Sequence, residues 1–181
     1  MKLLTGILLT LVLAAVVQAQ DVKLPFSVPE NTNLLPETAL VETSQGNFEV
    51  RFYRDDAPIT VRNFEYLGRK GFYKGLTFHR YVEGFVIQGG DPEGTGKGGP
   101  GYRIPPELRD IKHHAGTLGM AMLPASANPE RLSNGSQFYI TLADAPHLDG
   151  LFSVFAEVTS GMEVVRRLRQ GDRILEIRFP R

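Results

Sequence analysis

The chain has 181 residues, of which 42% are hydrophobic and 22% are charged, a composition typical of one soluble globular domain. It carries 20 Lys plus Arg and 20 Asp plus Glu, so its net charge gives no indication of binding to nucleic acid or to an acidic membrane surface. The absence of cysteine excludes disulfides, thiolate zinc ligands and a cysteine nucleophile.

The first 19 residues have the pattern of a secretory signal peptide. Lys2 gives a positive start, an apolar run follows from Leu3 to Val17, and small residues surround the end at Ala19. A membrane anchor is the alternative, but an apolar run of about 15 residues is short for the roughly 20 that a span needs. We therefore expect cleavage after Ala19, export to a periplasm or out of the cell, and no membrane attachment after cleavage. Residues 20–37 contain three prolines and are expected to form an extended leader.

From residue 38 onward, the pattern predicts many strands and two helices. Thr38–Thr43 and Asn47–Tyr53 alternate around a Ser-Gln-Gly turn, which predicts a β-hairpin. Asp55-Asp56-Ala57-Pro58 is expected to give an acidic cap to a helix that Gly71 ends. A second helix is predicted at Gly161–Gln170. The further predicted strands are Leu76–Tyr81, Phe85–Gln88, Gly116–Met122, Gln137–Leu142, Phe152–Val158 and Ile174–Phe179. Such a set suggests a β-barrel capped by helices.

The stretch that begins at Phe78 brings polar side chains close to aromatic rings. Successive strand residues point to opposite faces, so Phe78 and Arg80 are expected on one face, with His79 on the other, either in the core or as a support behind the site, and not as a catalyst. In the next strand, alternation separates Phe85 from Gln88 unless a bulge or twist re-aims Phe85. Taken alone, an Arg on a strand is more often a solvated surface charge than part of a site.

Two other motifs are interpreted as structural. Gly94–Gly99 matches G-x-G-x-x-G, but Pro100-Gly101 follows, so no helix can begin there to hold a pyrophosphate, and nucleotide binding is rejected. His113-His114 could suggest a metal site, but adjacent side chains diverge and no nearby His or Cys completes a ligand set. We therefore expect a polar turn at this pair. Neither a metal nor a cofactor is expected.

A second stretch, Asn134-Gly-Ser-Gln-Phe-Tyr139, changes the interpretation of the first. Together with Phe78-His-Arg80 and with Gly84-Phe85 through Gln88-Gly-Gly-Asp91, it resembles the cyclophilin family of peptidyl-prolyl isomerases, in the family's order and spacing. The likeness covers about residues 38 to 179 and suggests an exported member of bacterial type. It implies a mainly β domain over residues 38–181, a closed eight-stranded antiparallel barrel capped by two α-helices. It also implies an enzyme that accelerates rotation about X-Pro peptide bonds in folding proteins.

Carried over residue by residue, the resemblance makes Arg80 the catalytic donor to the twisted amide. The positions that wall the proline pocket, border it or bind the substrate backbone are Phe85, Val86, Gln88, Ala121, Met122, Gln137, Tyr139, His147, Leu148 and Phe152. Five of them depart from the best-known eukaryotic pattern: Val86 replaces Met, Met122 Asn, Tyr139 Phe, Phe152 His and His147 Trp. The Trp binds cyclosporin through its indole N–H in sensitive members, so weak inhibition by cyclosporin A is expected here.

The resemblance implies a monomer whose substrates are proline-containing polypeptides, among them unfolded exported proteins. An alternative of another class stays open: a chaperone or scaffold module that binds proline peptides in the same groove without significant turnover. Recruitment to a complex through the leader is compatible with both. The intact set of Arg80, Phe85, Gln88 and Gln137 favours the enzyme.

Overall fold

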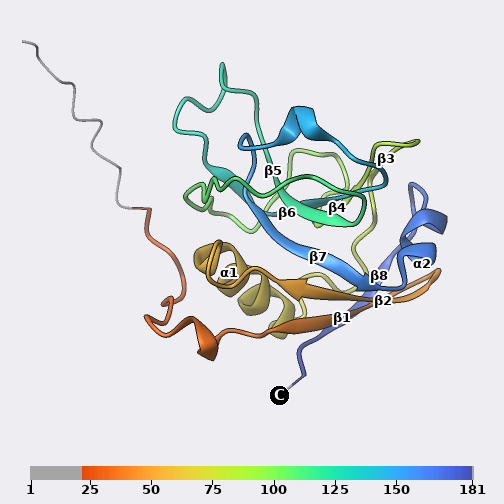
Figure 1. The fold of residues 1–181 in the computed structure, drawn as a ribbon, viewed down its shortest axis with the longest axis horizontal. Helices are drawn as coiled ribbons and strands as arrows, with labels where there is room; N and C mark the ends of the chain where they lie inside the picture. The colour runs from red at the N-terminus through yellow and green to blue at the C-terminus, as the bar shows by residue number, and fades with distance from the viewer. Residues whose placement is uncertain (1–21, 181) are drawn as a thin grey trace, which may run out of the picture.

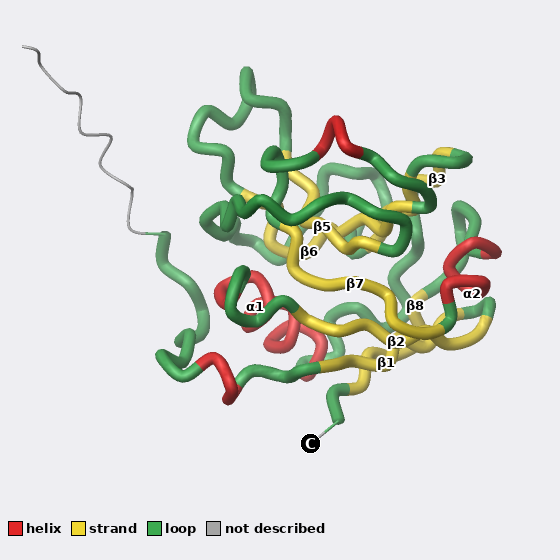
Figure 2. The backbone as a smooth tube through the Cα atoms, in the orientation of Figure 1, coloured by secondary structure: helices red, strands yellow, loops and turns green. Residues whose placement is uncertain are grey.

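The computed structural model describes residues 22–180 of the chain, in which a curled antiparallel sheet of eight strands surrounds the core (Figure 1). The strands are β1 Thr38–Thr43, β2 Gly46–Phe52, β3 Arg80–Val82, β4 Val86–Gly89, β5 Thr117–Met122, β6 Ser133–Thr141, β7 Val154–Ser160 and β8 Ile174–Arg178. Their order in the sheet is β3-β4-β6-β5-β7-β2-β1-β8. The helices are α1 Pro58–Arg69 and α2 Met162–Arg167, with short 3₁₀ segments at Thr32–Leu34 and Pro146–Leu148. Long loops join β4 to β5 and β6 to β7 (Figure 2).

The sheet is open, so the expectation of a closed barrel is wrong. Within residues 22–180, the edge strands β3 and β8 share no ladder, and a single isolated bridge, Thr77 to Arg173, links the segments that precede them. A strand over Leu76–Tyr81 would extend β3 far enough to pair, but its ladder with β4 begins only at Arg80. Backbone hydrogen bonds between the two segments keep the edges near each other. The result is a curled half-barrel.

The late start of β3 also separates two side chains that alternation places together. Phe78 is fully buried in the core, where its ring meets that of Phe138 edge-on at 6.5 Å, whereas Arg80 is exposed on the other face. Strand alternation holds only inside a ladder, and residue 78 lies outside it. For the same reason Phe85, which precedes β4, is free to turn to the face opposite Ile87.

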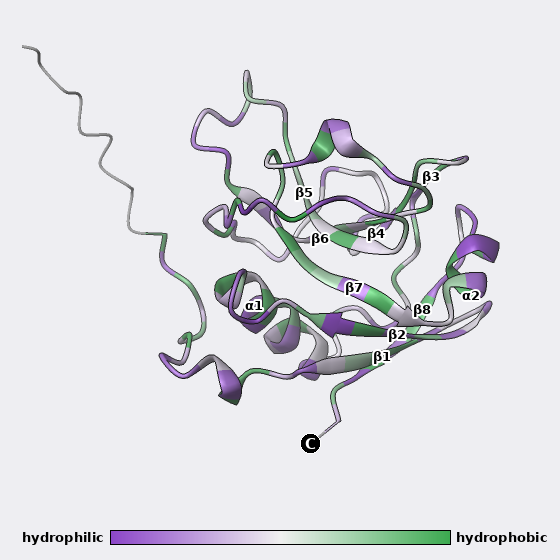
Figure 3. Ribbon diagram, in the orientation of Figure 1, coloured by the Kyte–Doolittle hydropathy of each residue, from purple (hydrophilic) through white to green (hydrophobic). Residues whose placement is uncertain are grey.

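Alternation does describe the strands that enclose the core. In β2 every second residue from Phe48 to Phe52 is buried and the residues between them are exposed, a pattern visible in the hydropathy colours of Figure 3. Helix α1 packs against the same core, and the Phe64 ring lies 5.2 Å from Phe155 and 5.5 Å from Phe138. Helix α2 lies apart from α1 along the sheet (Figure 1) and ends at Arg167, earlier than predicted, because Leu168 leaves the helical backbone conformation at ψ 138°.

The cap of α1 differs from the predicted one. The helix begins after Ala57, which makes no side-chain cap, so the acidic pair before it does not cap the helix. Instead the buried carboxylate of Glu107 accepts hydrogen bonds from the backbone N–H of Ile59 (3.0 Å) and of Thr60 (2.8 Å), and from the Thr60 hydroxyl (2.7 Å). Burial raises the pKa of the Glu107 carboxyl above its ordinary value, against these three donors.

The described part of the leader lies along α1, where the Phe26 ring packs against Tyr66 at 5.3 Å and the Arg62 Nε donates to the Ser27 carbonyl (3.1 Å). The predicted signal peptide, residues 1–19, lies outside the described residues. Among residues 22–180, no helix has the length and apolar character needed to cross a membrane.

Candidate active site

A row of paired residues crosses four neighbouring strands. Antiparallel pairing sets Arg80 of β3 opposite Gln88 of β4, Gln88 opposite Tyr139 of β6, and Tyr139 opposite Gly119 of β5. Paired residues point to the same face of a sheet. The pairing therefore brings an Arg, a Gln and a Tyr side by side on the face that looks away from the core.

An open and largely apolar depression of about 230 Å³ lies over this row. Its lining consists of Arg80, Phe85, Val86, Gln88, Ala121, Met122, Tyr139, Leu148 and Phe152. These nine residues are among those that the family resemblance placed at the site. The other two lie beside it: Gln137 is buried and hydrogen-bonded to Gln88, and the exposed His147 ring lies 5.3 Å from the Phe85 ring. The depression can bury a small aliphatic ring and leaves a guanidinium at its rim.

A chain of hydrogen bonds fixes the polar side of the depression. The Arg80 guanidinium donates to Gln88 Oε1 (3.4 Å), Gln88 Nε2 donates to Gln137 Oε1 (3.0 Å), and Gln137 Nε2 donates to the Gly98 carbonyl (2.8 Å). A guanidinium can only donate and a carbonyl can only accept, so the two ends determine how both amides point. The chain tethers the edge strand β3 to β6 and then to the loop after β4.

Tyr139 forms a wall of the depression because Gly119 leaves room for it. A Cβ atom at position 119 would overlap the Tyr139 hydroxyl and ring carbons. With hydrogen in that place, the ring lies across β5 and its hydroxyl reaches His113 Nε2 at 2.9 Å. Tyr139 is 6% exposed, and burial raises the pKa of its hydroxyl well above the ordinary value.

Behind this wall, His113 is held by Asp149. One carboxylate oxygen of Asp149 accepts from the backbone N–H of His113 (2.9 Å) and lies 3.0 Å from its Nδ1. An ionised carboxylate accepts only, so Nδ1 carries the proton and Nε2 accepts from the Tyr139 hydroxyl. Burial lowers the pKa of His113, although Asp149 opposes this shift. The backbone and side-chain hydrogen bonds from His113 hold the pKa of Asp149 below its ordinary value.

The sequence interpretation of the histidine pair as a polar turn misses this role of His113. Its side chain is wholly buried, whereas that of His114 is exposed and faces Asp144 at 3.6 Å, so the two imidazoles do diverge. The partners of His113 lie 26 and 36 residues further along the chain. No local pattern could have indicated them. His79, expected in the core or as a support behind the site, is half-buried, and within residues 22–180 neither of its ring nitrogens has a hydrogen-bond partner.

Comparisons with known proteins match this architecture. The family model of the cyclophilin type peptidyl-prolyl cis-trans isomerase matches residues 38–177. The chain belongs to the cyclophilin family. It is 49% identical to a peptidyl-prolyl cis-trans isomerase of Synechococcus elongatus over 143 residues, which are 78% of this chain and 94% of the relative. It is 47% identical to peptidyl-prolyl cis-trans isomerase B of Bacillus subtilis over 132 residues, 72% of this chain and 88% of the relative.

A solved cyclophilin type isomerase of Cryptosporidium parvum has the same fold, with a TM-score of 0.73 and 30% sequence identity over 81% of this chain and 98% of that one. These likenesses identify the enzyme as a peptidyl-prolyl cis-trans isomerase. Cyclophilins take proline-containing peptides as substrates.

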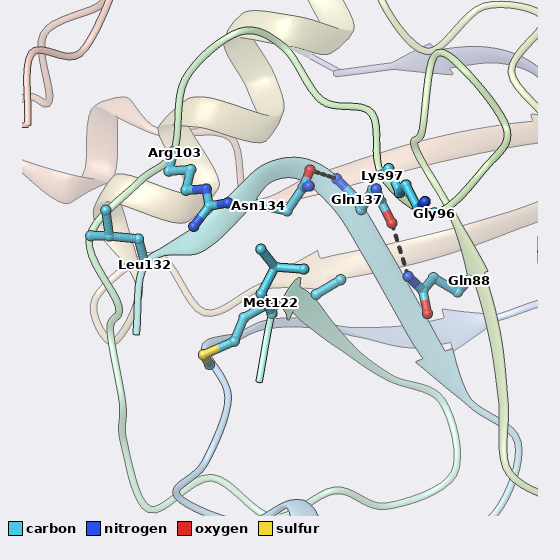
Figure 4. Close-up of a pocket in the computed structure, with 10 residues that line it drawn as sticks. Gln88, Gly96, Lys97, Arg103, Met122, Leu132, Asn134 and Gln137 are labelled. Carbon is cyan, nitrogen blue, oxygen red and sulfur yellow. Dashed lines mark hydrogen bonds between the residues drawn. The ribbon is translucent and has the colours of Figure 1, made fainter. Parts of the chain in front are cut away.

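In this cyclophilin the groove continues past the apolar depression. A smaller, more polar hollow of about 80 Å³ shares Gln88, Ala121 and Met122 with it and is drawn in Figure 4. The remaining lining residues are Gly96, Lys97, Arg103, Leu123, Leu132, Asn134 and Gln137. The glycine-rich loop thus forms one side of this hollow, and its Gly98 carbonyl accepts hydrogen bonds from Asn134 (3.1 Å) and from Gln137 (2.8 Å).

Proposed function

We propose that this cyclophilin accelerates X-Pro rotation by burying the proline ring in the apolar depression while Arg80 donates a hydrogen bond to the twisted amide nitrogen. The observation that carries the proposal is the place of Arg80. Its guanidinium is the one charged group among the nine residues that line the depression, and it is held there through Gln88 and Gln137.

Such a site needs few reactive groups, but it must hold the amide and its donor in a defined geometry. Rotation about a peptide bond costs about 18–20 kcal/mol because C–N resonance is lost in the twisted state. Uncatalysed X-Pro bonds interconvert over roughly 10–100 s. Reaching the millisecond range needs an acceleration of about 10⁵, which corresponds to about 7 kcal/mol. No bond breaks, so neither a nucleophile nor an acid–base pair is needed.

An Arg donor supplies this kind of stabilisation selectively. In the twisted amide the nitrogen regains its lone pair, which a planar amide lacks, so a donor aimed at that nitrogen binds the transition state more tightly than either ground state. The guanidinium stays charged and presents rigid N–H donors. The hydrogen-bond chain behind Arg80 limits its movement, and this preorganisation lowers the cost of aiming it.

The walls hold the proline ring so that its amide faces the donor. Val86 is 2% exposed and Tyr139 is 6% exposed, which makes both of them fixed surfaces. The half-buried Phe85, Leu148 and Phe152 complete the apolar lining. We assign the substrate backbone to Gln88, Ala121 and Gln137, as in the family.

Exchange NMR of an Ala-Pro peptide tests the proposal, because it separates binding from turnover without a coupling protease. We expect the mature protein to accelerate cis–trans exchange and its Arg80→Ala variant to do so at least 100-fold less while folded. Arg166→Ala, on the exposed side of α2, is the matched control and should keep full activity.

Two outcomes would contradict it. If Arg80→Ala remained as fast as the wild type, the donor role of Arg80 would be wrong. If the peptide resonances shifted on binding while exchange stayed at the uncatalysed rate, the protein would be a proline-peptide-binding module instead of an isomerase.

The remaining proposals concern location and ligands. From the pattern of residues 1–19, we propose that the protein is exported and acts as a monomer on polypeptides that fold outside the cytoplasm.

We also propose weak inhibition by cyclosporin A, because an imidazole at His147 stands where sensitive members have an indole. A nanomolar inhibition constant in the exchange assay would refute this last proposal.

A further inference from the structure

A third depression adjoins the proline pocket. It has a volume of about 460 Å³ and is lined by Met122, Leu123, Pro124, Ala125, Arg131, Leu151 and Phe152. Met122 and Phe152 belong to both this depression and the proline pocket, and Leu123 also lines the polar hollow. The three depressions therefore meet at Met122 and form one branched groove.

The walls of this depression are held in place by hydrogen bonds. One wall is the loop after β5, which is braced by Asn128: its buried side chain donates to the Leu132 carbonyl (2.8 Å) and accepts from the Leu132 N–H (3.1 Å). The other wall is the turn before β7. Arg131 joins the two, because its guanidinium donates to the Leu151 carbonyl.

The backbone conformation of Arg131 also indicates that the walls of this depression are held in place. Its φ is 56°, and it is the one non-glycine residue with a positive φ among residues 22–180. A side-chain-bearing residue persists in this region only where the surrounding contacts determine it. The two walls therefore form a preorganised surface, because the contacts that hold Arg131 also hold the loop against the turn.

The surface of the depression is unusually apolar for a solvent-facing site. Leu123 is 41% exposed and Leu151 is 46% exposed, and they are two of the four large hydrophobic side chains that are exposed within residues 22–180. A single exposed leucine needs no explanation. Two of them on either side of one hollow, beside a peptide-binding groove, indicate a contact surface for a ligand.

We propose that the depression between Leu123 and Leu151 binds a large apolar side chain of the same polypeptide whose proline occupies the neighbouring pocket. This inference rests on the proposed function. We infer this occupant because the two depressions are continuous: Met122 and Phe152 form part of both surfaces. An extended chain advances about 3.3–3.6 Å per residue. A side chain only a few residues from the proline can therefore reach the hollow.

The chemistry of the walls determines the class of side chain. Arg131 is the one charged residue in the lining, and its guanidinium is engaged by the Leu151 carbonyl. Leucine, isoleucine, methionine or phenylalanine would lose water contact on both walls at once, whereas a charged or small polar side chain would gain little. The enzyme should therefore favour prolines that lie near bulky apolar residues, as they do in segments that will enter a protein core.

A leucine scan tests the proposal. The host peptide contains one Ala-Pro unit with Ser at all other positions, and Leu replaces Ser at one position at a time on either side of that unit. We expect one position to raise kcat/KM about tenfold, equivalent to about 1.4 kcal/mol. Leu151→Ser and, independently, Leu123→Ser should lower the ratio of the Leu peptide to the Ser peptide to about one. Leu175→Ser, an exposed leucine on β8, is the matched control and should leave the ratio near ten.

The other outcomes would overturn the proposed apolar site or the isomerase function on which it rests. If the Ser peptide is turned over but no Leu position gains, the proposal is wrong while the isomerase function stands. If the gain survives in both leucine variants, its site is elsewhere and the proposal is also wrong. If no peptide is turned over, the proposed function fails, and the same ratio taken from dissociation constants decides on the apolar site. If the wild type sediments as a dimer and Leu151→Ser as a monomer, a second copy covers this surface and the proposal is overturned.

Discussion

Removal of the Tyr139 hydroxyl is expected to cost stability and leave catalysis nearly intact. Tyr139→Phe deletes one oxygen and keeps the ring that forms a wall of the apolar depression. In the wild type this oxygen donates to His113 Nε2 at 2.9 Å, and the His113 side chain is wholly buried. Asp149 fixes the proton on the other nitrogen, so after the substitution Nε2 is a buried acceptor without a donor.

The magnitude follows from that orphaned acceptor. A buried polar group that loses its partner costs about 1–3 kcal/mol. At about 2–4 °C per kcal/mol for a domain of this size, a loss of about 2 kcal/mol lowers the Tm by about 4–8 °C. The apolar wall is unchanged, so kcat/KM should fall less than about threefold, which corresponds to less than about 0.7 kcal/mol.

Denaturant unfolding and exchange NMR, done on the same samples, measure both effects. Tyr81→Phe is the matched control, since the Tyr81 ring lies beneath the Arg169 guanidinium at 4.7 Å and keeps that contact without its hydroxyl. A double-mutant cycle with His113→Asn should give a coupling of about 0.5–3 kcal/mol. An unfolding free energy within about 0.5 kcal/mol of the wild type, or strictly additive effects in the cycle, would refute the reasoning.

Two further predictions concern the same wall. Burial lowers the pKa of His113 below its ordinary value of 6.5, so the unfolded chain binds a proton that the folded chain does not, and the unfolding free energy should fall as the pH falls from about 6.5 toward that lowered pKa. Burial also lowers the pKa of His79, so His113→Gln should remove part of this slope in denaturant titrations, and an unchanged slope would contradict the assignment. Gly119→Ala should reduce kcat/KM at least tenfold, because the added Cβ would overlap both the Tyr139 hydroxyl and its ring carbon Cζ. Since the ring carbon clashes too, adding Tyr139→Phe should not restore the activity, and restoration would contradict this account.

Alternation along the strands predicted most of the sheet, and the family resemblance predicted its eight strands. Neither indicated that the sheet stays open, because closure depends on whether residues 76–79 join the ladder of β3. They do not: Phe78 turns into the core instead, against Gly89 and the edge of Phe138. The alternation of side chains along a strand does not indicate the residue at which the chain leaves its hydrogen-bonded ladder.

The family resemblance placed together nine side chains that do line one apolar depression, and five of them lie in its short motifs. The groups that support them could not be named from the sequence. His113 depends on Asp149, and α1 is capped by Glu107, 47 residues from its Thr60 partner. Such contacts form between segments that only the fold brings together, and a lone His or Glu has no periodic signature.

Strand β6 explains how the Arg80 guanidinium can be held in place although it lies on a sheet edge. Arg80 lies on β3, which has three residues and an unpaired outer side, and such a strand is by itself a poor support for a long side chain. Yet Gln137 and Tyr139 stand two residues apart on one face of β6, the longest strand, which is paired on both sides and buried along most of its length. One hydrogen-bond chain runs from Gln137 through Gln88 to Arg80, and the other runs from Tyr139 to His113. The edge strand therefore carries the guanidinium, while the centre of the sheet, paired on both sides, sets its distance from the Tyr139 wall.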